Sequence, residues 1–236
     1  MISNIAFIPA RKGSKGLPGK NKKLFLGKPL IQWSIEQAAE TKLFGKIIVS
    51  SDDPDILKIA SDCAEYKVIP VERHPELAKD NTTADEVLYD FFARPENRCK
   101  YICYLNPTSP LRSSEDIKKM YKFIKMKSYW TIISVKWCDF IGWVEKPTNQ
   151  GPVCTYNINK RPNRQTRDDF FLENGSIYWF KYEIFMAYGH MIANPEKVKL
   201  YEMPLERSLE IDTPFDFYMA ERAYEFTSME TASKTI

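Results

Sequence analysis

Short apolar runs alternate with amphipathic segments through most of the sequence, and this alternation restricts the chain to a small set of folds. Runs of strand length occur at residues 5–10, 46–50, 67–71, 101–105 and 130–136. Helical spacing or helix-start signals mark the segments between them, at residues 29–41, 54–66, 83–93 and 114–126. Strands that alternate with helices favour a mostly parallel sheet with helices on both faces. The sequence therefore predicts a three-layer α/β/α fold.

Residues 138–172 interrupt this rhythm with recurrent prolines and the basic stretch NKRPNRQTRDDF. A long irregular insert in a compact domain is usually functional or contacts a partner. After the insert, the pattern predicts strands at 175–181 and 197–203, a helix near 183–188 and a last helix from Pro214 to about Phe226. We expect one domain, residues 1–236, with 138–172 as an insert for dimerisation or substrate contact.

The composition, 44% hydrophobic and 28% charged, is that of a soluble globular protein. Lysine and arginine outnumber aspartate and glutamate by only 34 to 31, which argues against nucleic-acid or anionic-membrane binding. No apolar run approaches the roughly 18 residues of a membrane span, and Met1 begins no secretory leader pattern. We expect a cytoplasmic protein with neither a nucleic-acid nor a membrane partner.

The five cysteines are odd in number and form no CxxC pair. His74 and His190 are the only histidines that could complete a metal site with them. We interpret all five as reduced structural thiols.

The stretch RKGSKGLPGKN, residues 11–21, follows the first predicted strand directly. Gly13, Gly16 and Gly19 are spaced three and three, which does not fit the dinucleotide pattern GxGxxG. A Walker A loop is also excluded, because five residues separate Gly13 from Gly19 and Lys20 is followed by Asn21. Neither common glycine-rich phosphate motif explains the stretch.

Backbone N–H groups and four cations, Arg11, Lys12, Lys15 and Lys20, nevertheless converge on this turn. Such a cluster forms an anion cradle suited to a polyphosphate. A solvated basic turn would not need the glycines. The loop also lies at the carboxyl end of a strand, where ligands bind in α/β sheets.

Six blocks in order resemble the acylneuraminate cytidylyltransferases, the CMP-sialic acid synthetase family. They are IPARKGSKGLPGKN with GKPLIQWSIEQA, IIVSSDDPDI, ERHPELAKD, LNPTSPLRSSEDI, ENGSIY and RSLEIDTPFDF, and they extend from residue 5 to residue 217. The resemblance implies a Rossmann-like nucleotidyltransferase fold. It also implies the reaction: the anomeric hydroxyl of a 2-keto-3-deoxy sugar acid attacks the α-phosphorus of CTP, and pyrophosphate leaves.

By this resemblance, Arg11 and Lys20 contact the triphosphate and stabilise charge during transfer, with Asp212 as a third catalytic residue. The implied nucleotide-binding residues are Ala10, Gly13, Ser14, Lys15, Gly16, Asn21 and Arg73. The implied sugar-binding residues are Asn106, Thr108, Ser109, Arg164, Asn174 and Tyr178. Tyr178 has an alternative interpretation as a core residue, because it lies in an apolar strand.

Two departures from the family pattern concern the sugar. Asn106 stands where the family commonly has glutamine, and Leu172 stands near an arginine of many bacterial members. Arg164 or Arg167 in the insert would then meet the substrate carboxylate. The acceptor is expected to be a nine-carbon sialic-acid-like sugar; an octulosonate, a legionaminic-type sugar and a non-catalytic nucleotide-binding module stay open as alternatives.

Glu210 and Asp212 flank Ile211, and in a strand their side chains would point to the same side. Two carboxylates so placed would hold Mg²⁺ against the phosphates. The family usually has aspartate at the first position, so Glu210 is a further departure and Asp212 the safer ligand. Asp216 fits the first turn of the last helix instead. The resemblance also implies a homodimer in which the insert reaches the neighbouring subunit.

Overall fold

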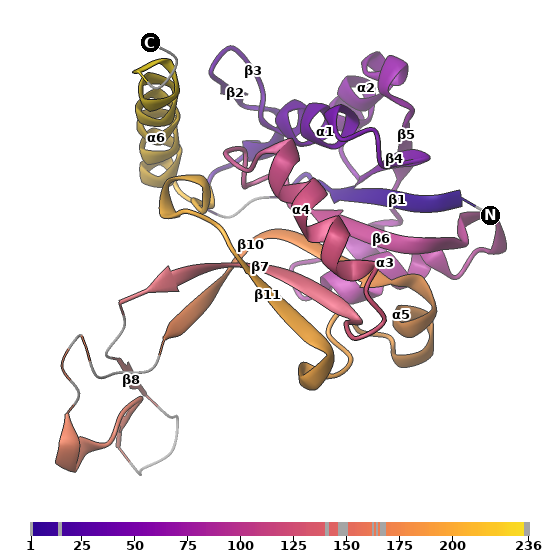
Figure 1. The fold of residues 1–236 in the computed structure, drawn as a ribbon. Helices are drawn as coiled ribbons and strands as arrows, with labels where there is room; N and C mark the ends of the chain where they lie inside the picture. Colours follow the sequence, from indigo (N-terminus) through magenta and orange to yellow (C-terminus); the bar gives the residue numbers. More distant parts are fainter. Residues whose placement is uncertain are drawn as a thin grey trace.

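The computed structural model describes residues 2–13, 16–139, 142–145, 151–161, 163, 165 and 169–233 (Figure 1). These residues contain a seven-stranded sheet in the order β11-β7-β10-β6-β1-β4-β5. Its strands are β1 (Ile2–Pro9), β4 (Lys46–Ser51), β5 (Val68–Glu72), β6 (Cys99–Leu105), β7 (Thr131–Cys138), β10 (Phe170–Lys181) and β11 (Val198–Glu202). Only β10 runs antiparallel, to both β6 and β7. The expected mostly parallel sheet is confirmed.

Helices cover both faces of the sheet, as the alternation predicts (Figure 1). The six α-helices of the described residues are α1 (Leu30–Glu40), α2 (Pro54–Asp62), α3 (Ala84–Phe92), α4 (Ser114–Ile124), α5 (Tyr182–Tyr188) and α6 (Pro214–Ser233). Apolar residues of α1, α2 and α4 share one core with Ala6 and Ile8 of β1. Residues of α3 and α5 share the opposite core with Ile5 and Phe7. Alternate residues of β1 thus face the two helical layers.

Helix starts follow from local chemistry. Thr83 and Ser113 each begin a helix with a reciprocal capping box, to Glu86 and Asp116 respectively. Asp53 caps α2, with Pro54 in its first turn. The helix expected over 54–66 is shorter, because α2 ends at Asp62. A 3₁₀ turn follows over Ala64–Tyr66, and it ends at Lys67, which adopts a left-handed φ of 61°.

The strand expected over 175–181 is longer, because β10 begins at Phe170 and pairs with the far end of β7. The ladder is irregular between Glu173 and Tyr178, where Gly175 adopts φ +66°. The two strands extend together beyond the sheet and carry a small ribbon of β8 (Trp143–Val144) and β9 (Val153–Cys154), which projects from the body as an arm (Figure 1). The ends of the predicted insert, 138–172, therefore belong to the main sheet.

The last helix also exceeds its expected length, since α6 continues to Ser233. It lies at the edge of the molecule, beside the small hairpin of β2 (Leu24–Phe25) and β3 (Lys28–Pro29) (Figure 1). In the described ranges, no helix is long and apolar enough to cross a bilayer. The five cysteines all lie in these ranges and are free thiols, as expected.

Candidate active site

A cavity of about 420 Å³ opens at the carboxyl ends of the parallel strands. β1, β5 and β6 end at this edge and are followed by Arg11, Arg73 and Asn106, which all line the cavity. The other lining residues are Pro9, Gly16, Lys20, Asn21, Thr82, Thr83, Ala84, Val87, Tyr104, Pro107, Thr108, Glu210 and Asp212. The edge of the sheet thus gathers residues that are up to 203 positions apart, from Pro9 to Asp212.

The glycine-rich opening loop is held against the segment that precedes α6. Lys20 donates hydrogen bonds to the carbonyl of Ile211 and to Oδ1 of Asp212, each over 2.7 Å. Gly16 comes so close that a Cβ atom built on it would lie 2.3 Å from the backbone oxygen of Asp212. A glycine is required there by close approach rather than by backbone conformation. The two ends of the chain therefore form one wall of the cavity.

Arg11, from the same loop, also lines the cavity. Its Nη1 donates to Oδ1 of Asp80 over 2.6 Å, and both side chains are partly exposed. Asn21 donates from Nδ2 to the carbonyl of Arg11, whereas its buried Oδ1 has no hydrogen-bond partner in the described part of the chain. An unsatisfied buried acceptor at a cavity wall indicates a site for a donor from ligand or water.

Arg73 approaches from the end of β5 and is 7% exposed. Its guanidinium donates to both Oγ and the carbonyl of Ser50, at 3.2 and 2.9 Å. Burial lowers the pKa of Arg73, and the nearby carboxylate of Asp52 partly offsets this effect. The residue is a fixed cation on the cavity wall.

Glu210 is held by neutral donors: Asn106 Nδ2 and Thr108 Oγ1 both donate to its Oε1, at 3.1 and 3.0 Å. Its Oε2 lies 3.1 Å from the position that a Cβ of Gly175 would occupy. Burial raises the pKa of Glu210; the hydrogen bond from Thr108 opposes this shift, and the charge of Asp212 adds to it. The charge of Asp212 is therefore close enough to Glu210 to raise its pKa.

The expected strand geometry of Glu210 and Asp212 is wrong, because this segment belongs to no strand. Ile211 is instead anchored by its N–H to the carbonyl of Thr108 over 2.8 Å. Both carboxylates nevertheless reach the cavity. Asp216 caps α6 as expected, accepting hydrogen bonds from the backbone N–H and hydroxyl of Thr213.

A buried arginine supports this part of the site. Arg112 is 2% exposed and donates to the carbonyls of Asn106 and Ser176, at 2.7 and 3.1 Å, and to the hydroxyl of Ser34. It therefore ties the loop after β6 to the turn in β10 beside Glu210. Burial lowers the pKa of Arg112 to about 9. An arginine buried to this degree is uncommon, and no sequence pattern singled it out.

The structure brings nine of the residues expected from the sequence to the cavity wall: Arg11, Gly16, Lys20, Asn21, Arg73, Asn106, Thr108, Glu210 and Asp212. Ala10 and Ser109 are buried beside the wall, and Gly13 is exposed outside it. Asn174 is also buried, and its side chain bonds to Ser134 and Ser208. Tyr178 packs on Tyr104 and donates to Glu173. Ser14, Lys15, Arg164 and Arg167 lie outside the described residues.

Sequence reasoning missed the wall formed by the start of α3, namely Thr82, Thr83, Ala84 and Val87. The signal was present: Thr-x-x-Glu at residues 83–86 marks a helix start, and in this fold helices start near the carboxyl edge of the sheet. Tyr104 was missed as well. It is partly buried at the end of β6, and the loss of solvent around its hydroxyl raises its pKa to about 12.

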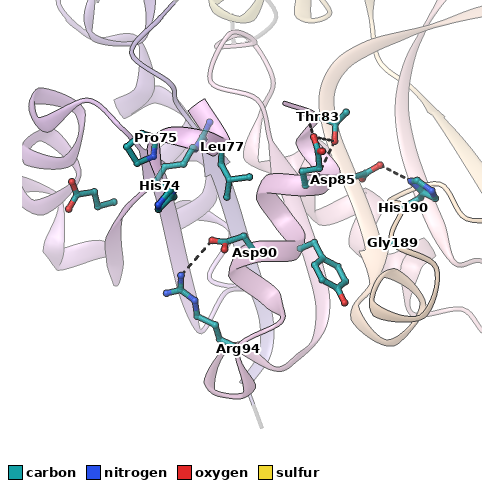
Figure 2. Close-up of a pocket in the computed structure, with 13 residues that line it drawn as sticks. His74, Pro75, Leu77, Thr83, Asp85, Asp90, Arg94, Gly189 and His190 are labelled. Carbon is teal, nitrogen blue, oxygen red and sulfur yellow. Dashed lines mark hydrogen bonds and ion pairs between the residues drawn. The ribbon is translucent and has the colours of Figure 1, made fainter. Parts of the chain in front are cut away.

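A second and larger cavity, of about 1080 Å³, adjoins the first, because Arg73 and Thr83 line both. Figure 2 shows it between the loop of His74 and Leu77 and helix α3, with an ion pair between Asp90 and Arg94 and a 3.2 Å polar contact between Asp85 and His190. Both histidines of the chain line this cavity. This second cavity was not expected from the sequence.

No group of three or more histidine, cysteine, aspartate or glutamate side chains that could hold a metal occurs among the described residues. Glu210 and Asp212 supply two carboxylates of the hard oxygen type that Mg²⁺ prefers. Mg²⁺ commonly takes one or two protein carboxylates and completes its shell with phosphate and water. The donor set thus fits such an ion only as a partial site.

The architecture, with a cation-rich cavity at the carboxyl edge of a mostly parallel sheet, is that of the α/β nucleotidyltransferases. CMP:2-keto-3-deoxy-manno-octonic acid synthetase, solved with CTP, superimposes with a TM-score of 0.67, covering 94% of this chain and 99% of its own at 17% identity. 4-Diphosphocytidyl-2C-methyl-D-erythritol synthase from Anaerococcus prevotii superimposes with a TM-score of 0.70, covering 94% and 96% at 13% identity. At these identities the likeness concerns the fold.

The chain belongs to the cytidylyltransferase family, whose model, described as "Cytidylyltransferase", matches residues 5–234. N-acylneuraminate cytidylyltransferase A of Danio rerio is 31% identical over 92% of the chain, which spans 50% of that relative's length. CMP-N,N'-diacetyllegionaminic acid synthase of Legionella pneumophila is 31% identical, covering 94% of the chain and 96% of its own length. The family expected from the sequence motifs is confirmed.

Proposed function

We propose that this chain transfers CMP from CTP to the anomeric hydroxyl of a 2-keto-3-deoxy sugar acid, with a nine-carbon, sialic-acid-like nonulosonate as the preferred acceptor. The observation that carries the proposal is the single cavity in which Arg11, Lys20 and Arg73 face Glu210 and Asp212, in a chain matched by the cytidylyltransferase family over residues 5–234. The names of the relatives support an acceptor of the sugar-acid type.

In this reaction the anomeric oxygen forms a bond to the α-phosphorus, and the bond from that phosphorus to the bridging oxygen breaks. Pyrophosphate leaves with the bonding electrons, and the hydroxyl proton passes to water. Catalysis of such a transfer depends on positioning and on stabilising charge. We assign Arg11 and Lys20 to contacts with the triphosphate, supported by backbone N–H groups of the opening loop.

For the nucleotide, we assign Asn21 and Arg73 to contacts with the ribose or cytosine. Asn21 has a buried acceptor without a partner among the described residues, which a ribose hydroxyl or an exocyclic amine would satisfy. Arg73 is fixed by Ser50 and needs no rearrangement to act as a donor. Glu210 and Asp212 would hold Mg²⁺, which when bound neutralises triphosphate charge.

For the acceptor, Asn106 and Thr108 lie next to Glu210, on the side of the cavity that the loop after β6 forms. We assign the sugar to this side. The Legionella relative, which matches the chain over nearly its whole length, favours a legionaminic-type acceptor as the second candidate. An octulosonate is a third, suggested by the CTP-bound synthetase of the same fold.

The acceptor is tested by incubating the purified chain with CTP, Mg²⁺ and, separately, N-acetylneuraminate, a diacetyllegionaminate and 3-deoxy-octulosonate. Pyrophosphate release and the mass of the CMP-sugar are measured. We expect the highest kcat/KM with a nonulosonate. If CTP raises the melting temperature and no acceptor releases pyrophosphate, the chain is a nucleotide-binding module instead.

The arm carries the proposed dimer contact. Trp143, Val144 and Val153 are exposed on its ribbon, and Ile158 is exposed just beyond it. Apolar side chains in such number on a projecting element are typical of an interface. Replacing Trp143 by serine should lower the dimer fraction measured by light scattering, and an unchanged dimer fraction would contradict this role.

A further inference from the structure

Helix α6 is apolar on two opposite faces. One face packs on the body: Phe217 and Ala220 are buried in the core cluster around Phe25 and Leu30. Farther along the same face, the ring of Tyr224 lies 5.4 Å from that of Trp33. This face explains why the helix is attached to the domain, but not why its other side is apolar.

The opposite face is solvent-exposed. It consists of Phe215, Tyr218, Met219, Phe226 and Met229, with exposed fractions from 40% at Met219 to 70% at Met229. At 100° per residue these side chains fall on one stripe about 21 Å long, on the far side of the helix from Phe217. Exposed apolar patches of this kind mark interaction sites.

The spacing of the stripe is symmetric about Arg222. Phe215 and Met229 lie seven residues before and after it, and Tyr218 and Phe226 lie four before and after it. A two-fold axis at Arg222 would place two helices antiparallel. Phe215 of each copy would then lie level with Met229 of the other, and Tyr218 of each with Phe226 of the other. Self-complementary surfaces of this form produce isologous dimers. We propose that α6 pairs with α6 of a second copy of this chain, antiparallel about Arg222.

The charges on the stripe agree with this partner. Arg222 donates to Glu225 over 2.7 Å in the same helix, and its guanidinium lies 5.5 Å from the centre of the Tyr218 ring. In the antiparallel pair, Glu225 of each copy is offset by about 4.5 Å along the axis from Arg222 of the other. Two arginines and two glutamates then meet at the axis, so the contact has no net charge.

A membrane surface is a poorer partner. The helix carries four acidic residues, Asp216, Glu221, Glu225 and Glu230, and a single basic one, Arg222. Helices that bind anionic lipid carry the opposite balance on their polar face. The charge pattern favours a protein partner.

The size of the stripe sets the strength of the contact. A fully buried aromatic side chain covers roughly 150–250 Å². The five residues of the stripe are between two-fifths and seven-tenths exposed, so the two copies together would bury on the order of 1,000 Å² in the symmetric pair. Contacts of this size are weak and reversible. The association should depend on concentration in the micromolar range, and it uses a surface separate from the arm.

The position of the proposed two-fold axis at Arg222 is tested by oxidative cross-linking of the full chain carrying Arg222→Cys. A cysteine on the axis should give a 222–222 disulfide-linked dimer, identified by peptide mass. Ser228→Cys is the matched control, because Ser228 is exposed on the same helix about 120° away. A yield no higher from Arg222→Cys than from Ser228→Cys would overturn the proposal.

Association is tested by analytical ultracentrifugation over a concentration series. All chains carry Trp143→Ser, which weakens the proposed arm contact. In this background the parent chain and Phe226→Leu should show the same rise in mass, whereas Phe226→Glu should lose it, with at least a tenfold weaker association. Met126→Glu is the control, because it introduces a charge at an exposed methionine outside α6. It should leave the rise in mass unchanged. Equal association of Phe226→Glu and the parent chain, with its melting temperature unaltered, would exclude α6 as the contact. Loss of association in Met126→Glu to the same extent would exclude it too.

Discussion

The two walls of the cavity are built from polar groups in different ways. The opening-loop wall, formed by Arg11, Gly16, Lys20 and Asn21, carries cations whose carboxylate partners, Asp80 and Asp212, are more than half exposed. The β6–β10 wall, formed by Asn106, Thr108 and Glu210, is held by neutral donors and by Arg112 beneath it.

Exposed ion pairs contribute little to stability, so the Arg11–Asp80 pair of the opening-loop wall can be exchanged for a pair with a bound anion at small cost. Lys20 is itself buried and also bonds to the carbonyl of Ile211, but the carboxylate of its partner Asp212 is exposed. The β6–β10 wall is fixed from beneath, because the buried hydrogen bonds from Arg112 to Ser176 and Ser34 would leave unsatisfied groups if they were broken. We therefore expect the triphosphate at the wall that can exchange partners and the acceptor sugar at the wall that cannot.

The largest expected effect is on the fixed wall. Arg112→Ala removes the donors of three buried acceptors and should lower the free energy of unfolding by about 4 kcal/mol. Urea unfolding measures this. Arg94→Ala, at an exposed pair with Asp90, is the control and should change it by no more than about 0.5 kcal/mol. Equal, small effects of both changes would show that the wall does not depend on Arg112.

The next effect concerns turnover at the exchangeable wall. Lys20→Met keeps the length of the side chain and removes its charge, and kcat should fall about a hundredfold or more because transition-state charge loses a contact. Lys22→Met is the control: Lys22 pairs with Asp53 and Asp55 and does not line the cavity. Initial rates of pyrophosphate release distinguish the two, and a similar loss in both variants would contradict the role of Lys20.

Gly16→Ala tests the contact that joins the two ends of the chain. The added methyl would lie 2.3 Å from the backbone oxygen of Asp212, so one segment must shift, at a cost of about 1–3 kcal/mol. Gly13→Ala is the matched control, because no heavy atom lies within 4 Å of its Cβ position in the described structure. Thermal unfolding should show a lower midpoint for Gly16→Ala alone, and equal midpoints for both variants would contradict the close approach.

Local patterns in the sequence carried most of the fold. The strands and helices were predictable because each depends on a short apolar run or on a cap such as Thr83 with Glu86. The antiparallel position of β10 between β6 and β7 was not, since strand order depends on contacts between distant segments. The lengths of β10 and α6 were underestimated because their outer residues form no apolar run of the expected period: those of β10 pair with β7, and those of α6 continue the helix.

For the site, residues directly after strands were predictable from the rule that ligands bind at the carboxyl edge. Arg11 and Asn106 are examples. Contacts made across the molecule were beyond local reasoning, and so was the use of Arg112 as a buried support. Asn174 was expected at the sugar, whereas the structure shows its amide bonded inside the protein, so its contact with the sugar stays a prediction.

A smaller effect is expected from Glu210, whose pKa is raised mainly by burial. The native state binds this proton more tightly than the unfolded state, so its contribution to stability is present at low pH and is lost as pH rises from the ordinary value of 4.5 through the raised native pKa. Glu210→Gln does not titrate. Its stability relative to wild type should therefore increase with pH across that window, as measured by urea unfolding in a pH series. A difference that stays constant with pH would show that the carboxyl group is not perturbed.

The smallest effect should come from Asp80, which occupies Arg11 at the exchangeable wall. Asp80→Asn removes a charge that competes with the triphosphate for Arg11, and the pair is worth no more than about 1 kcal/mol because both side chains are partly exposed. The Kd for CTP should fall by no more than about fivefold, with kcat unchanged, as measured by calorimetry and initial rates. Weaker CTP binding would instead mean that Asp80 holds Arg11 in its binding position, and Arg11 would then belong with the fixed part of the cavity.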